Sequence, residues 1–287
     1  MVGLKGISAV VATLNSEKTI KRCIESILSN GLNEIVLVDG GSSDRTITIA
    51  EKYPAVKIIK NVKGGRPSQK DAGWRVAEGS LILFMDSDTY IDDGTVPALL
   101  PHLKDEALAG ISCRVACANP QNILARLRDF DFELFYSELF RESRVAEAPA
   151  DPTGCGLFKR RALEEIDGFD LEYPYAEDLK LLHRLQRKGY RVQMTYTPVV
   201  YHHHRENLKG VCEQFYWHGY GRGMLVEETR QKFYLKRNPI KLMSRFLKTA
   251  IKKDTKLIPL YPIYRALIEV AFLLGYAHGR TSRRYPR

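Results

Sequence analysis

The stretch Leu81-Ile82-Leu83-Phe84-Met85-Asp86-Ser87-Asp88 decides how this sequence folds. Its first five residues form a short, continuous apolar run, which is typical of a buried strand in a parallel sheet. Ligands of open α/β sheets bind just outside the carboxyl ends of such strands, and Asp86 and Asp88 occupy that place. Carboxylate oxygens suit Mg²⁺ or Mn²⁺, so the pair is a candidate cation site. A solvated turn is the alternative, because Asp is also common in turns.

Strands and helices alternate on the amino-terminal side of this stretch. We predict strands over residues 7–13, 34–38, 56–59 and 81–85. A helix follows each of the first three strands: the first begins at residues 15–16, the second ends at residue 49, and the third covers 67–78. Further along, we predict strands over 108–115, 154–158 and 190–194, and helices over 123–139 and 177–188. The alternation predicts an α/β fold with a mainly parallel central sheet flanked by helices and right-handed crossovers.

The charge of the chain is unevenly distributed. Its 287 residues carry a formal net charge of +10. Residues 1–204 hold 26 Lys and Arg against 28 Asp and Glu, whereas residues 205–287 hold 18 against 6. We therefore predict one α/β domain over 1–204 and a basic helical region over 205–287. Such an asymmetry indicates contact with an anionic surface, either a membrane or a nucleic acid.

The cysteines and the apolar segments bear on the cellular location. The five cysteines are widely spread and complete no zinc pattern, so we expect reduced thiols in a cytosolic protein. The first strand begins almost at once, and we expect no signal peptide. Residues 240–253 predict a basic amphipathic helix, and Leu257 to Gly279 an interfacial or packing helix, because its prolines and charges argue against a membrane span.

Four segments, taken in order, resemble one family. They are Val11-Ala12-Thr13-Leu14-Asn15, Val38-Asp39-Gly40-Gly41-Ser42-Ser43-Asp44-Arg45-Thr46, Gly79 through Asp88, and Glu177-Asp178 after Gly168-Phe169-Asp170. Together they resemble the nucleotide-binding and acidic motifs of family 2 glycosyltransferases, which have the GT-A fold. The resemblance covers roughly residues 6–225, and Phe215 to Gly223 is similar to a segment of membrane-associated members.

The resemblance implies a nucleotide diphosphate sugar as donor, UDP- or GDP-linked, and a divalent ion, Mg²⁺ or Mn²⁺. Asp88 is expected to bind the ion, and Asp86 the ribose or a metal-bound water. The other residues expected around the donor are Thr13, Asn15, Asp39, Arg66 and Lys70. A plain helix N-cap is the alternative for Asn15, and exposed salt bridges are the alternative for the two cations.

Two histidines are further metal candidates. The resemblance allows a histidine after the last strand to complete the metal shell, and neutral imidazole is a common metal ligand. Alternate residues of an extended segment share a face, so we expect His202, and after it His204, in this role. A polar strand edge without a ligand is the alternative. Two departures from the family pattern, Gly40 for an Asp and Asp71 for an Asn, leave the nucleotide open.

The acidic pair carries the proton chemistry that the resemblance implies. Asp178 is expected to act as general base on the acceptor hydroxyl, and Glu177 to orient the acceptor or the base. Adjacent helix residues point about 100° apart, so the two cannot share one role. A single base with in-line attack predicts inversion at the anomeric carbon. Ordinary acids at a helix N-terminus, favoured by the macrodipole, are the alternative.

The resemblance thus implies an inverting, metal-dependent glycosyltransferase with a lipid-linked or saccharide acceptor. We expect it at the cytoplasmic, inner face of the cell membrane, held peripherally on anionic lipid, with no nucleic-acid partner. One alternative is a nucleotidyltransferase, but the first strand is followed by no glycine-rich phosphate loop. Another is a non-catalytic protein of the same fold that binds nucleic acid or membrane. A homodimer, the sugar and the acceptor all stay open.

Overall fold

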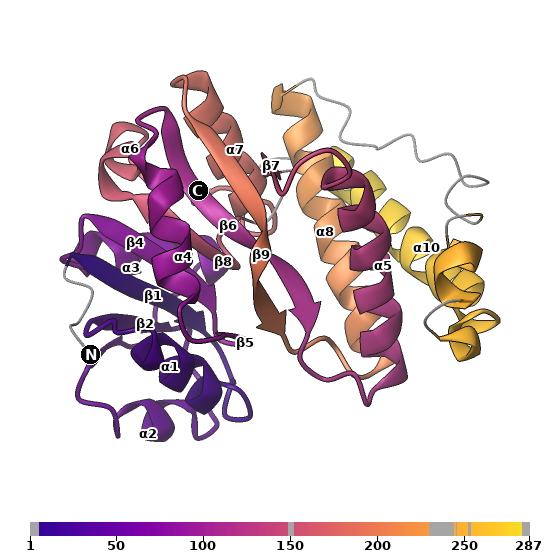
Figure 1. Cartoon of the computed structure of the whole chain (residues 1–287), viewed down its shortest axis with the longest axis horizontal. Helices are drawn as coiled ribbons and strands as arrows, with labels where there is room; N and C mark the ends of the chain where they lie inside the picture. The colour runs from indigo at the N-terminus through magenta and orange to yellow at the C-terminus, as the bar shows by residue number, and fades with distance from the viewer. Residues whose placement is uncertain (1–5, 149–151, 230–243, 245, 252–253, 283–287) are drawn as a thin grey trace. The chain divides into compact units, whose positions relative to one another are not determined.

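The computed structural model describes residues 6–148, 152–229, 244, 246–251 and 254–282. The chain divides into two compact units. The first comprises residues up to 118 together with 142–203, and the second comprises 119–141 together with the chain from 204 onward. Figure 1 shows that the helices labelled α5, α8 and α10 make up most of the second unit.

Four parallel strands form the first half of the sheet in the first unit. They are β1 (Ile7–Thr13), β2 (Ile35–Asp39), β3 (Val56–Ile59) and β4 (Leu81–Asp86), in the order β3-β2-β1-β4. Every residue of β1 and β2 is buried, which explains why these strands are continuous apolar runs in the sequence. The predicted parallel alternation is confirmed for this half.

The second half of the sheet is mixed. It contains β8 (Cys155–Lys159), β6 (Leu108–Cys117), β9 (Arg191–His202) and β5 (Thr89–Ile91), while β7 (Val145–Glu147) pairs with β9. Strand β8 enters antiparallel between β4 and β6, and β6 and β9 run parallel. Strand β9 is longer than predicted, because its last residues pair with β5 and place His202 opposite Thr89.

Helices flank this sheet (Figure 1). They are α1 (Ile20–Ser29), α2 (Thr46–Ala50), α3 (Gly65–Val76), α4 (Thr95–Leu99), the 3-10 helix η1 (Leu100–Lys104), α6 (Arg160–Glu165) and α7 (Glu177–Arg187). The helical spacing of Ile20, Cys23, Ile24 and Ile27 predicted one apolar face, and all four side chains are fully buried in the core. The fold is therefore α/β, as the sequence predicted.

The second unit is helical and has a core of its own. Its elements are α5 (Ile123–Leu139), α8 (Leu208–Thr229), the 3-10 helix η2 (Thr255–Leu257) and α10 (Leu260–Thr281). Phe130 of α5 packs edge-on against Tyr261 of α10, and Phe246 stacks on the same tyrosine. Asp131 lies buried beside this cluster and accepts hydrogen bonds from Tyr261 Oη at 2.6 Å and Arg265 Nη1 at 2.8 Å. These contacts fix one face of α10 to α5.

Glycines bring α8 and α10 into backbone contact. A Cβ on Gly219 or Gly223 would clash with backbone atoms of α10, and one on Gly275 or Gly279 would clash with backbone atoms of α8. Each helix thus carries two glycines four residues apart, the spacing that lets helices approach closely. The opposite face of α10 is apolar and exposed.

The exposed apolar face of α10 bears on the prediction that Leu257 to Gly279 form an interfacial or packing helix and not a membrane span. Its exposed side chains are Leu260, Ile263, Leu267, Val270, Leu273 and Leu274. Among the described helices, α10 has the length and composition to cross a membrane, although it contains the charges that argued against a span. Of the predicted helix over 240–253, residues 244 and 246–251 are helical, with Leu247 and Ile251 exposed. Residues 240–243, 245, 252 and 253 lie outside the described residues.

The substitution Gly275→Ala is expected to loosen the α8–α10 contact. The added methyl group would lie closer than 3.0 Å to the backbone oxygen of Tyr216, which cannot move aside as a side-chain end can. We expect the free energy of unfolding to fall by about 1–3 kcal/mol, measured by urea denaturation. Gly210→Ala in α8 is the control, because its new methyl group would meet only side-chain atoms. Equal stability of the two variants would contradict the close contact.

Candidate functional site

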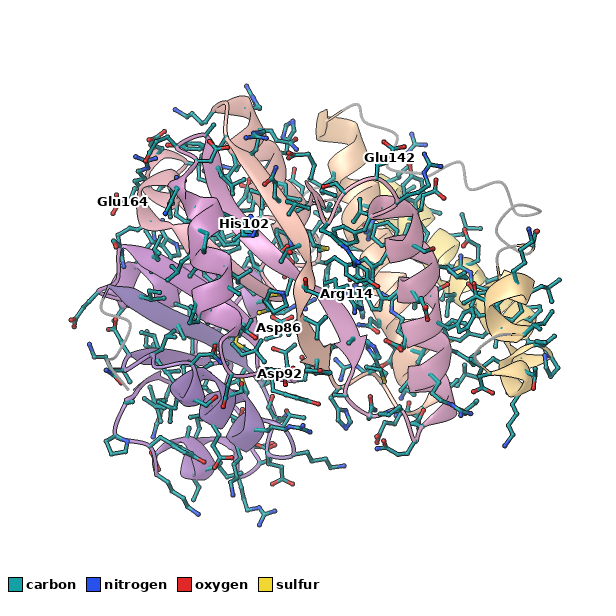
Figure 2. All side chains as sticks on the ribbon, in the orientation of Figure 1. Asp86, Asp92, His102, Arg114, Glu142 and Glu164 are labelled. Atoms are coloured by element: carbon teal, nitrogen blue, oxygen red, sulfur yellow. The ribbon has the colours of Figure 1, made fainter. Side chains whose placement is uncertain are left out.

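The carboxyl ends of β1, β2 and β4 meet at one edge of the sheet. In the strand register, Thr13 lies opposite Asp39, and Ala12 lies opposite Asp86. Figure 2 labels Asp86 in the first unit, where β4 ends. The hydroxyl of Thr13 is buried and makes no hydrogen bond with any described residue. Thr13, Asp39 and Asp86, which were predicted to surround a ligand, therefore lie at the ends of adjacent strands. The Thr13 hydroxyl is a buried polar group that a ligand could hydrogen-bond.

Asp39 shapes the turn that follows β2. Its Oδ2 accepts hydrogen bonds from the backbone N–H groups of Gly41 at 2.9 Å and Ser42 at 3.0 Å, and its Oδ1 accepts from Ser42 Oγ at 2.5 Å. Gly41 has φ +102°, a conformation that favours glycine. The carboxylate thus holds a turn of fixed shape at the strand end. Its predicted contact with a base or ribose stays a prediction.

Asn15 connects the loop after β1 to the loop after β2. Its backbone lies in the left-handed region, with φ 51°, and its Oδ1 accepts a hydrogen bond from the backbone N–H of Ser43 at 2.9 Å. Helix α1 begins later than expected, at Ile20, with Thr19 at the cap position. The helix-cap alternative for Asn15 is therefore wrong, because its side chain bonds to the neighbouring loop instead.

Gln69 is a site residue that sequence reasoning missed. It lies buried on α3 and its Nε2 donates to the backbone oxygens of Thr13 at 2.7 Å and Val38 at 3.0 Å. This one amide therefore joins the ends of β1 and β2. A Cβ at position 40 would lie 3.0 Å from Gln69 Nε2, so the amide would have to shift by a few tenths of an ångström to make room for it.

Lys70 lies at the centre of a cluster of carboxylates. Its side chain is 1% exposed, and Nζ lies 3.4 Å from Asp86 Oδ1, 3.9 Å from Asp178 Oδ1 and 4.0 Å from Glu177 Oε1. Arg66, one turn earlier on α3, approaches Glu177 at 3.4 Å and Asp86 at 3.9 Å. The structure thus brings five predicted site residues together. The exposed salt-bridge alternative is wrong for Lys70, because its ammonium group is enclosed.

Burial and charge act in opposite directions in this cluster. Burial by itself would lower the pKa of Lys70, but Asp178, Asp86 and Glu177 raise it above the ordinary value for lysine. Burial raises the pKa of the Glu177 carboxyl group, with Arg66 and Lys70 acting against it. Lys70 therefore stays cationic, and Glu177 holds a proton more readily than an ordinary glutamate does.

The acidic pair lies at the buried N-terminus of α7. Glu177 and Asp178 occupy the first turn of the helix, and both are buried. The Oε1 atom of Glu177 makes no hydrogen bond with any described residue. Asp178 Oδ1 accepts a hydrogen bond from the hydroxyl of Thr153. The pair therefore faces the cations of α3, unlike ordinary solvated acids at a helix start.

Asp88 and His202 approach each other beside the end of β4. Asp88 Oδ1 lies 3.4 Å from His202 Nε2, and the backbone N–H of His203 donates to the backbone oxygen of Asp88 at 2.9 Å. Among the described residues, no group of three or more His, Cys, Asp and Glu side chains is arranged to hold a metal ion. One carboxylate and one imidazole nevertheless lie side by side where the sequence predicted a cation.

His204 is described with the second unit. Its backbone N–H donates to Asn119 Oδ1 at 2.9 Å, and its backbone oxygen accepts from Asn119 Nδ2 at 3.0 Å. The ring is buried and stacks on Phe132 of α5 at 5.8 Å. Within the first unit, the structure brings His202 beside Asp88, and the role predicted for His204 stays a prediction.

Known proteins resemble this chain in sequence. The family described as Glycosyl transferase family 2 matches residues 8–167. The uncharacterized glycosyltransferase EpsJ of Bacillus subtilis is 32% identical over 113 residues, which are 37% of this chain and 33% of EpsJ. The poly-beta-1,6-N-acetyl-D-glucosamine synthase of Staphylococcus epidermidis is 24% identical over 198 residues, 66% of this chain and 48% of the synthase. The chain spans about a third and about half of these relatives.

Solved structures share the fold. The mannosyltransferase PcManGT from Pyrobaculum calidifontis, in complex with GDP-Man and Mn2+, matches with a TM-score of 0.69 and 19% identity, over 96% of this chain and 86% of that one. The S. aureus TarS 1-349 structure in complex with UDP matches with a TM-score of 0.53 and 19% identity, over 98% and 93% of the two chains. Both likenesses support a GT-A fold for this chain.

The substitution Gln69→Leu is expected to weaken the edge at which the strand ends meet. It leaves the buried backbone oxygens of Thr13 and Val38 without their side-chain donor, so the free energy of unfolding should fall by about 1–3 kcal/mol. Urea denaturation measures the change. The exposed Gln186→Leu on α7 is the control and should change stability by less than about 0.5 kcal/mol. A Gln69→Leu variant as stable as the control would contradict the bridging role.

Proposed function

Because the chain belongs to glycosyl transferase family 2, we propose that it moves a sugar from a nucleotide diphosphate sugar to an acceptor hydroxyl, with inversion at the anomeric carbon. The observation that carries this proposal is the cluster of Lys70 with Asp86, Glu177 and Asp178 at the carboxyl edge of the sheet. It places cations and a carboxylate pair at the edge where α/β sheets bind their ligands.

In this reaction the acceptor oxygen attacks the anomeric carbon while the bond from that carbon to the diphosphate oxygen breaks. Asp178 takes the proton of the acceptor hydroxyl, and the electron pair of the broken bond leaves with the nucleoside diphosphate. One displacement at one carbon inverts its configuration. Glu177, buried beside Asp178, orients the acceptor.

The cations of α3 serve the leaving group. Arg66 and Lys70 approach Asp86 from the same helix, and their charge balances the negative charge that develops on the diphosphate. Thr13, Asn15 and Asp39 provide the nucleoside side of the site. The polar hydroxyl of Thr13, which lacks a hydrogen bond to any described residue, supports that assignment.

The side-by-side carboxylate of Asp88 and imidazole of His202 support a divalent-ion site beside the end of β4. These two residues would hold Mg²⁺ or Mn²⁺, and Asp86, whose Oδ1 lies 3.4 Å from Lys70 Nζ, stays a predicted ligand of the ion or of a metal-bound water. When bound, the ion stabilises charge on the diphosphate. His204 stays a further predicted ligand. The neighbours bound to GDP-Man and UDP make guanosine and uridine donors the first to test.

The second unit serves the acceptor side by holding the enzyme on a membrane. The exposed apolar face of α10 supports this, because its other face is fixed to α8 and α5. Interfacial helices bury an exposed apolar face of this kind in the bilayer, and each Lys or Arg near an anionic leaflet adds about 1 kcal/mol. We therefore place the protein peripherally on the cytoplasmic face, with catalysis in residues 1–204, membrane contact in 205–287 and a lipid-linked or saccharide acceptor.

The substitution Asp178→Asn is expected to lower kcat at least about 100-fold, because the amide cannot take the acceptor proton. Binding of the nucleotide sugar should change little. Transfer is measured with a panel of UDP-, GDP- and dTDP-sugars in the presence of Mn²⁺, and donor binding by calorimetry. Asp93→Asn, at an exposed position, is the control and should transfer normally. Normal transfer by Asp178→Asn would show that the base lies elsewhere, and a wild-type protein that neither binds nor turns over any donor would overturn the proposed function.

The double substitution Ile263→Glu with Leu274→Glu is expected to release the protein from membranes. Both side chains are more than 60% exposed on α10, so the carboxylates oppose insertion into lipid without disturbing the fold. Sedimentation with vesicles of phosphatidylglycerol should fall at least about tenfold, because two apolar contacts with lipid are lost and two carboxylates that anionic lipid repels are added. Leu171→Glu, an exposed leucine of the first unit, is the control. Unchanged sedimentation of the double variant would rule out this face of α10.

A further inference from the structure

Thr153 lies between Lys70 and Asp178. Its side chain is fully buried, two residues before β8 begins. Lys70 Nζ lies 2.7 Å from Thr153 Oγ1, and the same hydroxyl bonds to Asp178 Oδ1. The next residue, Gly154, accepts a hydrogen bond from the backbone N–H of Asp86 at 3.1 Å. The threonine therefore lies beside the end of β4, where Asp86 stands.

The chemistry of the three groups fixes the direction of both hydrogen bonds. An ammonium group has donors and no acceptor, so Lys70 donates to Thr153 Oγ1. The hydroxyl has one proton, and an ionised carboxylate only accepts, so that proton points to Asp178 Oδ1. Each bond has one charged partner, which makes both stronger than neutral hydrogen bonds.

The direct approach of Lys70 to Asp178 cannot replace this bridge. Nζ lies 3.9 Å from Asp178 Oδ1, beyond hydrogen-bond distance. The ammonium group thus attracts the carboxylate without fixing its rotation about the side-chain bond. Thr153 supplies the directional contact that an ion pair at this distance lacks.

We propose that Thr153 is a positioning residue that holds the carboxylate of Asp178 in the orientation needed to take the acceptor proton. The inference rests on the proposed function, in which Asp178 is the base. The chain Asp86–Lys70–Thr153–Asp178 then connects the donor side of the site to the acceptor side. A base displaced by about 1 Å can cost about 100-fold in rate, so a single hydroxyl has a measurable effect.

Two matched pairs of side chains test this role. Thr and Val have the same shape, and Ser and Ala differ by one oxygen atom, so each pair isolates the hydroxyl. We expect Thr153→Val and Thr153→Ala to lower kcat by about 10- to 100-fold, with the donor dissociation constant within about threefold of wild type. Thr153→Ser should restore kcat to within about threefold of wild type. Steady-state transfer, calorimetric donor binding and thermal melting are measured on the full chain.

The outcomes separate this inference from the proposed function. A wild-type protein without transferase activity overturns the proposed function and this inference with it. An active wild type with Thr153→Val and Thr153→Ala equally active overturns this inference alone. The same holds if Thr153→Ser loses as much kcat as Thr153→Ala, because shape and not the hydroxyl would then matter. If Thr153→Val fails to fold, the Ser and Ala pair gives the answer.

Discussion

The ammonium group of Lys70 is enclosed by three carboxylates, and the arrangement of the site depends on it. Asp86 ends a strand, whereas Glu177 and Asp178 open a helix about ninety positions later in the chain. Two buried acids beside the partly buried Asp86 would repel one another and take up protons. A buried cation between them makes their charges compatible with burial, and Arg66 adds a second, partly exposed cation. Removing Lys70 alone would therefore leave several buried charges uncompensated, which is costlier than losing one ion pair.

The parallel half of the sheet determines where this cluster forms. Register places the ends of β1, β2 and β4 side by side, so side chains that follow three separate strands share one edge. Gln69 and Lys70 are neighbours on α3, yet one joins the backbone ends of β1 and β2 while the other meets the acids. Helix α3 can lie close to β1 because Gly73 has no side chain. A Cβ at this position would clash with Val10 of β1. The position of α3 against the sheet thus determines where the Lys70 ammonium group lies relative to the strand ends.

Periodicity and motif order predicted much of the fold, because the buried strands and the apolar face of α1 depend on local sequence alone. The acidic residues were also predictable from local sequence, because Asp86 and Asp88 follow an apolar strand and Glu177 and Asp178 follow the Gly168-Phe169-Asp170 segment. The enclosure of Lys70 was not, because its partners come from β4 and α7. Gln69 and Thr153 carry no motif, and their roles depend on which backbone oxygen or carboxylate ends beside them. Asn15 was ambiguous because a cap and a loop bridge use the same side-chain atoms.

One of the basic residues of 205–287 has a structural role in the second unit. The guanidinium group of Arg265 donates hydrogen bonds to the carboxylates of Asp131 and Glu269. That ion pair orients α10, together with the glycines that face α8. The apolar side chains of α10 are thereby directed away from the core of the unit, and a lone amphipathic helix would have no such fixed orientation. The buried ion pair and the small residues of the α8–α10 contact thus determine which face of α10 is exposed and apolar.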